Sequence, residues 1–163
     1  MAQIPFSRLP ADSRIWVFVA ERPVTGEAAE RLLGEVDRHL DRWSAHGSPL
    51  TCAREWRDDR FLTIGVDQST ENASGCSIDG LFRTLRGLEA AIGTTLVGGG
   101  RVHFREPSGE IRTVSRDEFS ELAAAGQVTP STRVFDPTVP TLGAWREGFE
   151  KSAGESWHAS LLG

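Results

Sequence analysis

The fold begins with a strand at residues 15–19, where the sequence reads IWVFV. A short, continuous apolar run rich in β-branched and aromatic side chains is typical of a strand buried on both faces. The turn PVTG at residues 23–26 follows and opens a helix. From Ala29 to Trp43, apolar residues recur at steps of three and four, with charged residues between them. This spacing predicts an amphipathic helix, which we expect to end at residues 47–49.

The next segments predict two more strands, a second helix and a further strand. Residues 50–56 and 61–66 favour β structure, and the polar break RDDR between them is a hairpin pattern. After a polar loop, apolar side chains recur at helical spacing over residues 78–92. Residues 101–105 alternate apolar and polar side chains, as a half-buried strand does.

These elements follow the order β-α-β-β-α-β over residues 14–105, which is the order of a ferredoxin-like sandwich. We therefore predict an α+β fold with that sandwich as its core. Residues 106–163 are expected to form a C-terminal extension made of a hairpin, a short helix and an aromatic tail. The capping box SRDE at residues 115–118 opens that helix. With 163 residues, the chain is expected to be a single domain, residues 1–163.

Composition excludes several classes of protein. Hydrophobic residues make up 39% and charged residues 25%, which is ordinary for a globular domain and unlike a disordered tail or a coiled-coil rod. The net charge of −5 argues against a nucleic-acid platform or a lipid-binding basic surface. No stretch approaches the roughly 20 apolar residues that span a bilayer, and the N-terminus lacks the pattern of a secretory signal. We expect a cytoplasmic protein that binds neither nucleic acid nor membrane.

Residue counts narrow the chemistry further. Lys151 is the only lysine beside 17 arginines, it has no Gly-rich approach, and tyrosine is absent. A P-loop lysine and a tyrosine acid are therefore excluded. Cys52 and Cys76 form no CxxC pair, and the four histidines show no metal-ligand spacing, so we expect no disulfide, metal or cofactor.

The sharpest local signal is the start of the second predicted helix, NASGCSID at residues 72–79. Ser74 is placed to cap the helix, so that Cys76 and Ser77 fall in its first turn. Free backbone N–H groups and the helix dipole favour a thiolate there, and Gly75 allows a ligand to approach the backbone. The alternative is that Cys76 is a small buried residue that begins a helix.

The predicted topology brings other reactive groups to the same edge. In a β-α-β-β-α-β sandwich the first helix ends where the second begins, and the third strand also ends there. His46 and Asp67 would then share a rim with Cys76. A thiolate nucleophile needs a base and a group that orients the base, so Cys76, His46 and Asp67 are candidate catalytic residues. The alternative for His46 is a simple helix C-cap.

A second candidate binding site is the tail ESWH at residues 155–158. A segment that carries Trp157 and His158 together can dock against a ligand or partner. The alternative, which we favour, is ordinary packing by Trp157 with a solvated His158. His39 and His103 are expected on the surface.

The stretches SAHG (44–47), SGCSID (74–79) and ESWHA (155–159) resemble a family of small bacterial proteins, found mostly in Bacteroidetes. Many members of that family carry the label "ABC transporter ATPase". This chain has no Gly-Lys-Ser/Thr loop, which argues against that label. The resemblance implies no particular activity. The tail also has Ser160 and Leu161 where the resemblance implies an arginine and an aromatic residue, which puts a binding role for the tail in doubt.

Two functional classes therefore stay open. The first is a binding module for a small molecule or a protein, including a second copy of the chain as a homodimer, through an exposed sheet face or edge. The second is a small thiol-dependent enzyme that uses Cys76 with His46. We favour the binding module, because a fold of this class supports many functions and does not by itself imply catalysis.

Overall fold

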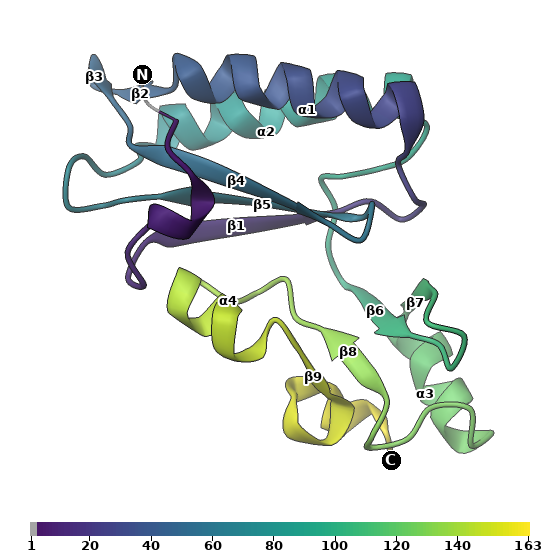
Figure 1. The fold of residues 1–163 in the computed structure, drawn as a ribbon. Helices are drawn as coiled ribbons and strands as arrows, with labels where there is room; N and C mark the ends of the chain where they lie inside the picture. The colour runs from purple at the N-terminus through teal and green to yellow at the C-terminus, as the bar shows by residue number, and fades with distance from the viewer. Residues whose placement is uncertain (1–2) are drawn as a thin grey trace. The chain divides into compact units, whose positions relative to one another are not determined.

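A computed structural model describes residues 3–163 of the chain. The described residues form four α-helices and three antiparallel sheets, which confirms the predicted α+β class (Figure 1). The chain divides into two compact units. The N-terminal unit runs up to Gly98 and includes Thr138–Arg146, and the C-terminal unit contains Gly99–Pro137 and Glu147–Gly163.

The N-terminal unit is built on a three-stranded sheet in the order β1-β5-β4. Its strands are β1 (Arg14–Val19), β4 (Cys52–Arg57) and β5 (Phe61–Val66), all antiparallel to their neighbours. All residues of the central strand β5 are buried. The predicted hairpin between β4 and β5 is confirmed, with Asp58 and Asp59 at φ of 56° and 55° in its turn. Asp is one of the few residue types other than glycine that adopts this left-handed conformation readily.

Two long helices, α1 (Gly26–Asp41) and α2 (Gly75–Ile92), lie side by side on one face of this sheet (Figure 1). Their apolar stripes form the largest core cluster together with the side chains of the facing strands. Helix α1 ends at Asp41, before the expected residues 47–49. The chain there forms a small hairpin instead, β2 (Ser44–Ala45) with β3 (Ser48–Pro49), because His46 and Gly47 both adopt positive φ, as a tight two-residue turn requires.

The other face of the sheet carries a smaller apolar cluster of Leu9, Ile15, Ala53 and Leu142. The short helix η1 (Phe6–Arg8) and α4 (Leu142–Gly148) contribute to it, and the rings of Phe6 and Trp145 lie 5.4 Å apart. The Ile15 N–H donates to the carbonyl of Pro140. This bond ties Thr138–Arg146 to β1 within the N-terminal unit.

The C-terminal unit has a four-stranded antiparallel sheet in the order β7-β6-β8-β9. The strands are β6 (Arg101–Arg105), β7 (Ile111–Ser115), β8 (Arg133–Phe135) and β9 (Glu150–Ser152). Helix α3 (Arg116–Ala124) packs on this sheet, and the chain ends in η2 (Ala153–Glu155) and η3 (Trp157–Leu161). The predicted capping box between Ser115 and Glu118 is confirmed.

The sheet order does not show a ferredoxin-like topology. In that sandwich, β6 would be the fourth strand of the N-terminal sheet, but β6 pairs with β7 and β8 instead. The physical reason is that the order of elements along a chain does not fix which strands hydrogen-bond. The β6–β7 hairpin, with its turn at Pro107–Gly109, gives β6 a local partner at a small cost in loop-closure entropy.

Candidate functional site

The start of α2 has the capped geometry that its sequence predicts. The Ser74 side chain accepts a hydrogen bond from the Ser77 N–H, and the Ser77 hydroxyl in turn lies 2.7 Å from the Ser74 nitrogen. Ser77 is buried, whereas Gly75 and Cys76 are exposed. Both serine side chains are therefore used to cap the helix, and the Cys76 thiol is accessible to solvent.

Trp43, two residues after the end of α1, is hydrogen-bonded to the start of α2. Its indole Nε1 donates to the carbonyl of Ser77 at 2.7 Å, in the buried core. The β2 strand of the small hairpin also contacts α2. The structure thus places Trp43 and β2, which precede His46, against the helix that carries Cys76.

The proposed catalytic groups are not joined by hydrogen bonds within residues 3–163. His46 is exposed at the tip of its hairpin, with a φ of 53°. Asp67 accepts from both the N–H and the hydroxyl of Ser69, at 2.9 and 2.7 Å, and so stabilises its own loop. The assignment of Cys76, His46 and Asp67 to catalysis stays a prediction.

Two histidines lie elsewhere than expected. His39 is half-buried between α1 and α2, where its Nδ1 lies 3.2 Å from the Thr84 hydroxyl and burial lowers its pKa. His103 is buried on β6, with its Nδ1 2.9 Å from the Thr113 hydroxyl. The surface position expected for both is wrong. For His39 a signal was present, because it stands four residues before Trp43 and so lies on the same side of the helix.

The C-terminal tail packs against its own unit, and His158 rather than Trp157 is its most buried residue. The His158 ring is fully buried, and its Nδ1 lies 2.7 Å from the Ser156 hydroxyl. Burial lowers the pKa of His158 to about 4, an effect that the Asp136 charge opposes. Trp157 is half-buried against the core of the unit, beneath the guanidinium of Arg116. The expectation of a solvated His158 is wrong, because Ser156 and the neighbouring rings replace its contacts with water.

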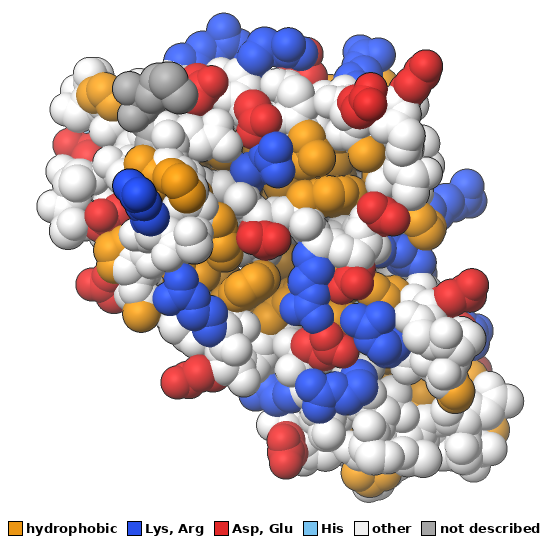
Figure 2. Space-filling view, viewed as in Figure 1, with side chains coloured by type: hydrophobic (Ala, Val, Ile, Leu, Met, Phe, Trp, Pro, Cys, Tyr) orange, Lys and Arg blue, Asp and Glu red, His pale blue; other side chains and the backbone are white. Residues whose placement is uncertain are grey.

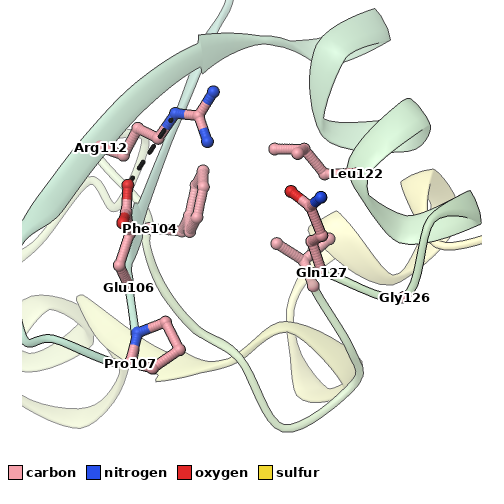
Figure 3. Close-up of a pocket in the computed structure, with 8 residues that line it drawn as sticks. Phe104, Glu106, Pro107, Arg112, Leu122, Gly126 and Gln127 are labelled. Atoms are coloured by element: carbon pink, nitrogen blue, oxygen red, sulfur yellow. Dashed lines mark ion pairs between the residues drawn. The ribbon is translucent and has the colours of Figure 1, made fainter.

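A pocket of about 400 Å³ opens in the C-terminal unit beside the β6–β7 hairpin. In Figure 3, Leu122 and Gln127 face the ring of Phe104 across the opening, and Arg112 and Glu106 form a charged wall. Arg112 Nε and Glu106 Oε1 are 4.0 Å apart. The residues that line this pocket are Phe104, Glu106, Pro107, Arg112, Leu122, Gly126, Gln127 and Val128.

A second hollow of about 350 Å³ continues from the first. The two share Phe104, Glu106, Pro107 and Gln127, so they form one extended depression, which we call the β6–α3 groove. The far part of the groove adds arginine and hydroxyl side chains to this shared lining. The residues that line only that part are Arg105, Thr129, Ser131, Thr132 and Arg133.

Three guanidinium groups and one carboxylate line the groove, in a protein whose net charge is −5. Arg105 donates to Glu150 at 3.2 Å and to the carbonyl of Gly109. Arg133 is 3.8 Å from the same Glu150 carboxylate, and its side chain is 48% exposed. In Figure 2, acidic and basic side chains are interspersed over the visible face. Arginines therefore outnumber carboxylates along this groove, although the chain as a whole has a negative net charge.

No local pattern in the sequence predicts this groove. Its walls come from the β6–β7 turn, from helix α3 and from the segment that follows α3. The sequence predicts each of these segments as a local element and does not predict that they line one groove. One signal in the sequence is the position of Arg105, Arg112 and Arg133 near predicted turns. Whether these three arginines lie together depends on strand pairing, which the sequence does not reveal.

Comparisons with known proteins give no indication of function, so the inference of a function starts from the geometry of the groove. No protein-family model, curated protein or solved structure matches this chain. Over residues 3–163, no three or more His, Cys, Asp or Glu side chains are grouped so that they could hold a metal ion. Among the same residues, every helix is too short or too polar to cross a bilayer.

Proposed function

We propose that this protein is a binding module and that the β6–α3 groove is its binding site. The observation that carries the proposal is the extended depression itself, with two parts of about 400 and 350 Å³. Ligand pockets have volumes of roughly 300–1,000 Å³, with apolar walls and a few convergent polar groups. Phe104, Leu122 and Val128 supply such walls, and Gln127 and Arg112 supply polar groups.

The groove is built on a rigid floor. Phe104 is only 4% exposed and packs edge-on against Phe119, with ring centroids 5.6 Å apart. Its strand, β6, is paired on both sides, with β7 and with β8. A site that is already formed before binding loses little conformational entropy when a ligand enters, and this favours affinity.

In this proposal the N-terminal unit serves as the scaffold of the binding module. We propose that it is a ferredoxin-like sandwich without the fourth strand, on the basis of its order β1-β5-β4 and of two helices on one face. Two free cysteines, Cys52 and Cys76, favour a reducing compartment such as the cytoplasm. The resemblance to the small bacterial family adds no activity to this proposal.

The alternative function is a thiol-dependent enzyme that uses Cys76 with His46. One observation favours it, the exposure of Cys76 in the first turn of a capped helix. Its weakness is that the thiol of Cys76 has no base bonded to it among the described residues.

The proposed function is tested by a fragment screen observed by NMR on the isotope-labelled full-length protein. We expect hits whose shift changes centre on Phe104, Gln127 and Val128. The blocking variant is Gln127→Trp, because Gln127 is exposed at the groove and a larger ring there fills the opening. Gln68→Trp, an exposed glutamine in the N-terminal unit, is the matched control.

The groove hits should disappear in Gln127→Trp and remain in Gln68→Trp. Hits that cluster away from the groove, or groove hits that survive in Gln127→Trp, would overturn the assignment. Both changes are at exposed positions, so we expect both variants to fold. Circular dichroism before the screen checks this.

A further inference from the structure

We infer that the β6–α3 groove binds a short acidic segment of another protein, with an apolar side chain in the first pocket and carboxylates near Arg112 and Arg133. This inference rests on the proposed function, because it names the ligand class of the same groove. Two observations support it. The groove has two parts, and the exposed side chains of Arg112 and Arg133 line it.

The shape of the groove favours an extended chain. The first part has apolar walls from Phe104, Leu122 and Val128, and the second part adds hydroxyl groups and arginines to the Phe104 and Pro107 that it shares with the first. Phe104 and Gln127 belong to both parts, so the two are continuous. An extended peptide places successive side chains at separate positions along such a depression.

Arg112 is the group best placed to take a new carboxylate. Its ion pair with Glu106 is long, 4.0 Å, and both side chains are well exposed, at 46% and 36%. An exposed pair at this distance contributes little to stability, about 0–1 kcal/mol. A peptide carboxylate that forms a closer bond with Arg112 therefore displaces only a weak interaction. Arginine also presents several N–H donors in a planar fork that matches a carboxylate.

Arg133 provides the second point of attachment. Its guanidinium donates to the carbonyl of Glu150 at 3.2 Å and lies 3.8 Å from the Glu150 carboxylate. That carboxylate also accepts the 3.2 Å bond from Arg105, so it serves two guanidinium groups. The exposed side of Arg133 faces the polar part of the groove, where Thr129 and Ser131 supply hydroxyl groups. Charge complementarity thus favours an anionic partner over a neutral or basic one.

Fluorescence anisotropy with labelled peptides tests this inference on the full-length protein. The probes are a pool of eight-residue peptides that carry one Leu or Phe among Asp and Glu residues, and a second pool in which Asn and Gln replace every acid. We expect the acidic pool to bind at least about tenfold more tightly at low salt, and the difference to shrink as ionic strength rises.

The protein variants are Arg112→Gln and Arg133→Gln, with Arg86→Gln as the matched control. Arg86 is an exposed arginine on α2 in the N-terminal unit. We expect each groove variant to weaken binding of the acidic pool by about five- to tenfold, the usual range for one charge-assisted contact, and the control to leave binding unchanged.

Three results would overturn the inference, and they separate it from the proposed function. Equal binding of both pools, lost in Gln127→Trp, would reject the acidic ligand and keep the groove as the site. Fragment hits in the groove without binding of either pool would reject the peptide and keep the proposed function. Absence of both fragment hits and peptide binding would overturn both proposals.

Discussion

The Nδ1 atom of His158 lies 2.7 Å from the hydroxyl of Ser156, inside a fully buried environment where the other ring nitrogen, Nε2, has no hydrogen-bond partner among residues 3–163. A charged imidazole in this position would need a partner for both N–H groups. The fold therefore holds His158 in its neutral form, with Nδ1 hydrogen-bonded to the Ser156 hydroxyl. The cost of protonating this ring gives the protein a dependence on pH.

We predict that the free energy of unfolding falls as the pH drops from 7 towards 4. The pKa of His158 is about 4 in the folded chain, against an ordinary value of 6.5, so the unfolded chain binds the proton first. The contribution is fully present above pH 6.5 and is lost as the pH falls, by about 3 kcal/mol over the whole range. Urea unfolding at a series of pH values measures it.

His158→Asn removes the titrating group while keeping an acceptor near the position of Nδ1. We expect this variant to be less stable at neutral pH and to have a flatter stability profile between pH 7 and 4. His46→Asn, at an exposed site, is the control and should keep the profile of the unchanged protein. An identical slope in His158→Asn would show that another group carries the pH dependence.

The two cysteines should differ sharply in reactivity. Cys76 is exposed, whereas Cys52 is buried, donates to the carbonyl of Leu40, and has a pKa raised to about 12 by burial and by the charge of Asp41. We predict that iodoacetamide labels Cys76 in the folded protein and Cys52 only after unfolding. Mass spectrometry of digested samples over time measures this.

His46→Ala distinguishes the binding module from the thiol-dependent enzyme. Because no hydrogen bond joins His46 to Cys76 in the described part of the chain, we expect the same labelling rate in the variant at each pH. A clear drop in the rate near neutral pH would indicate a thiolate that His46 stabilises. That result would favour the enzyme, and a substrate search would then centre on the start of α2.

Loss of the bond between Trp43 and Ser77 should destabilise the N-terminal unit. Trp43→Phe keeps an aromatic ring but removes the buried indole donor to the Ser77 carbonyl. We expect a loss of about 1–3 kcal/mol in the free energy of unfolding, measured with urea. Trp56→Phe on β4, where the ring is half-buried, should cost less than half as much. Equal losses would mean that ring volume, and not the hydrogen bond, determines the effect.

Two glycines give a contrasting pair of substitutions. A Cβ atom on Gly65, in the central strand β5, would lie 2.6 Å from the Cδ1 atom of Leu9, which is itself buried. We predict that Gly65→Ala costs about 1–3 kcal/mol, the range for overpacking a core. At Gly75, in the first turn of α2, a Cβ atom meets nothing within 4 Å. Gly75→Ala should therefore be neutral or stabilise the helix by up to about 1 kcal/mol.

Thermal unfolding of both variants checks this contrast. A stable Gly65→Ala protein would show that Leu9 can rotate away from the strand. A destabilised Gly75→Ala protein would show that the first turn of α2 needs the freedom of glycine.

Local patterns in the sequence predicted most of the elements. The apolar run at residues 15–19, the helical spacing of α2, the N-cap at Ser74 and the capping box at Ser115 all appear in the structure. These signals depend only on neighbouring residues, because side-chain periodicity and caps act within one or two turns. Helix α1 ends before the predicted residues 47–49, because His46 and Gly47 form the turn of a hairpin and not a helix terminus.

The sequence by itself determined the class of the fold, the positions of the main helices and strands, and the N-cap at Ser74 that begins α2. Only the tertiary structure decided that β6 pairs with β7 and β8, that His158 is buried, and that Phe104, Arg112 and Gln127 line one groove. The physical reason is the separation along the chain of the residues that make contact. Strand pairing, burial and pockets depend on contacts between residues far apart in the chain, and the pattern of any one segment does not specify its distant partner.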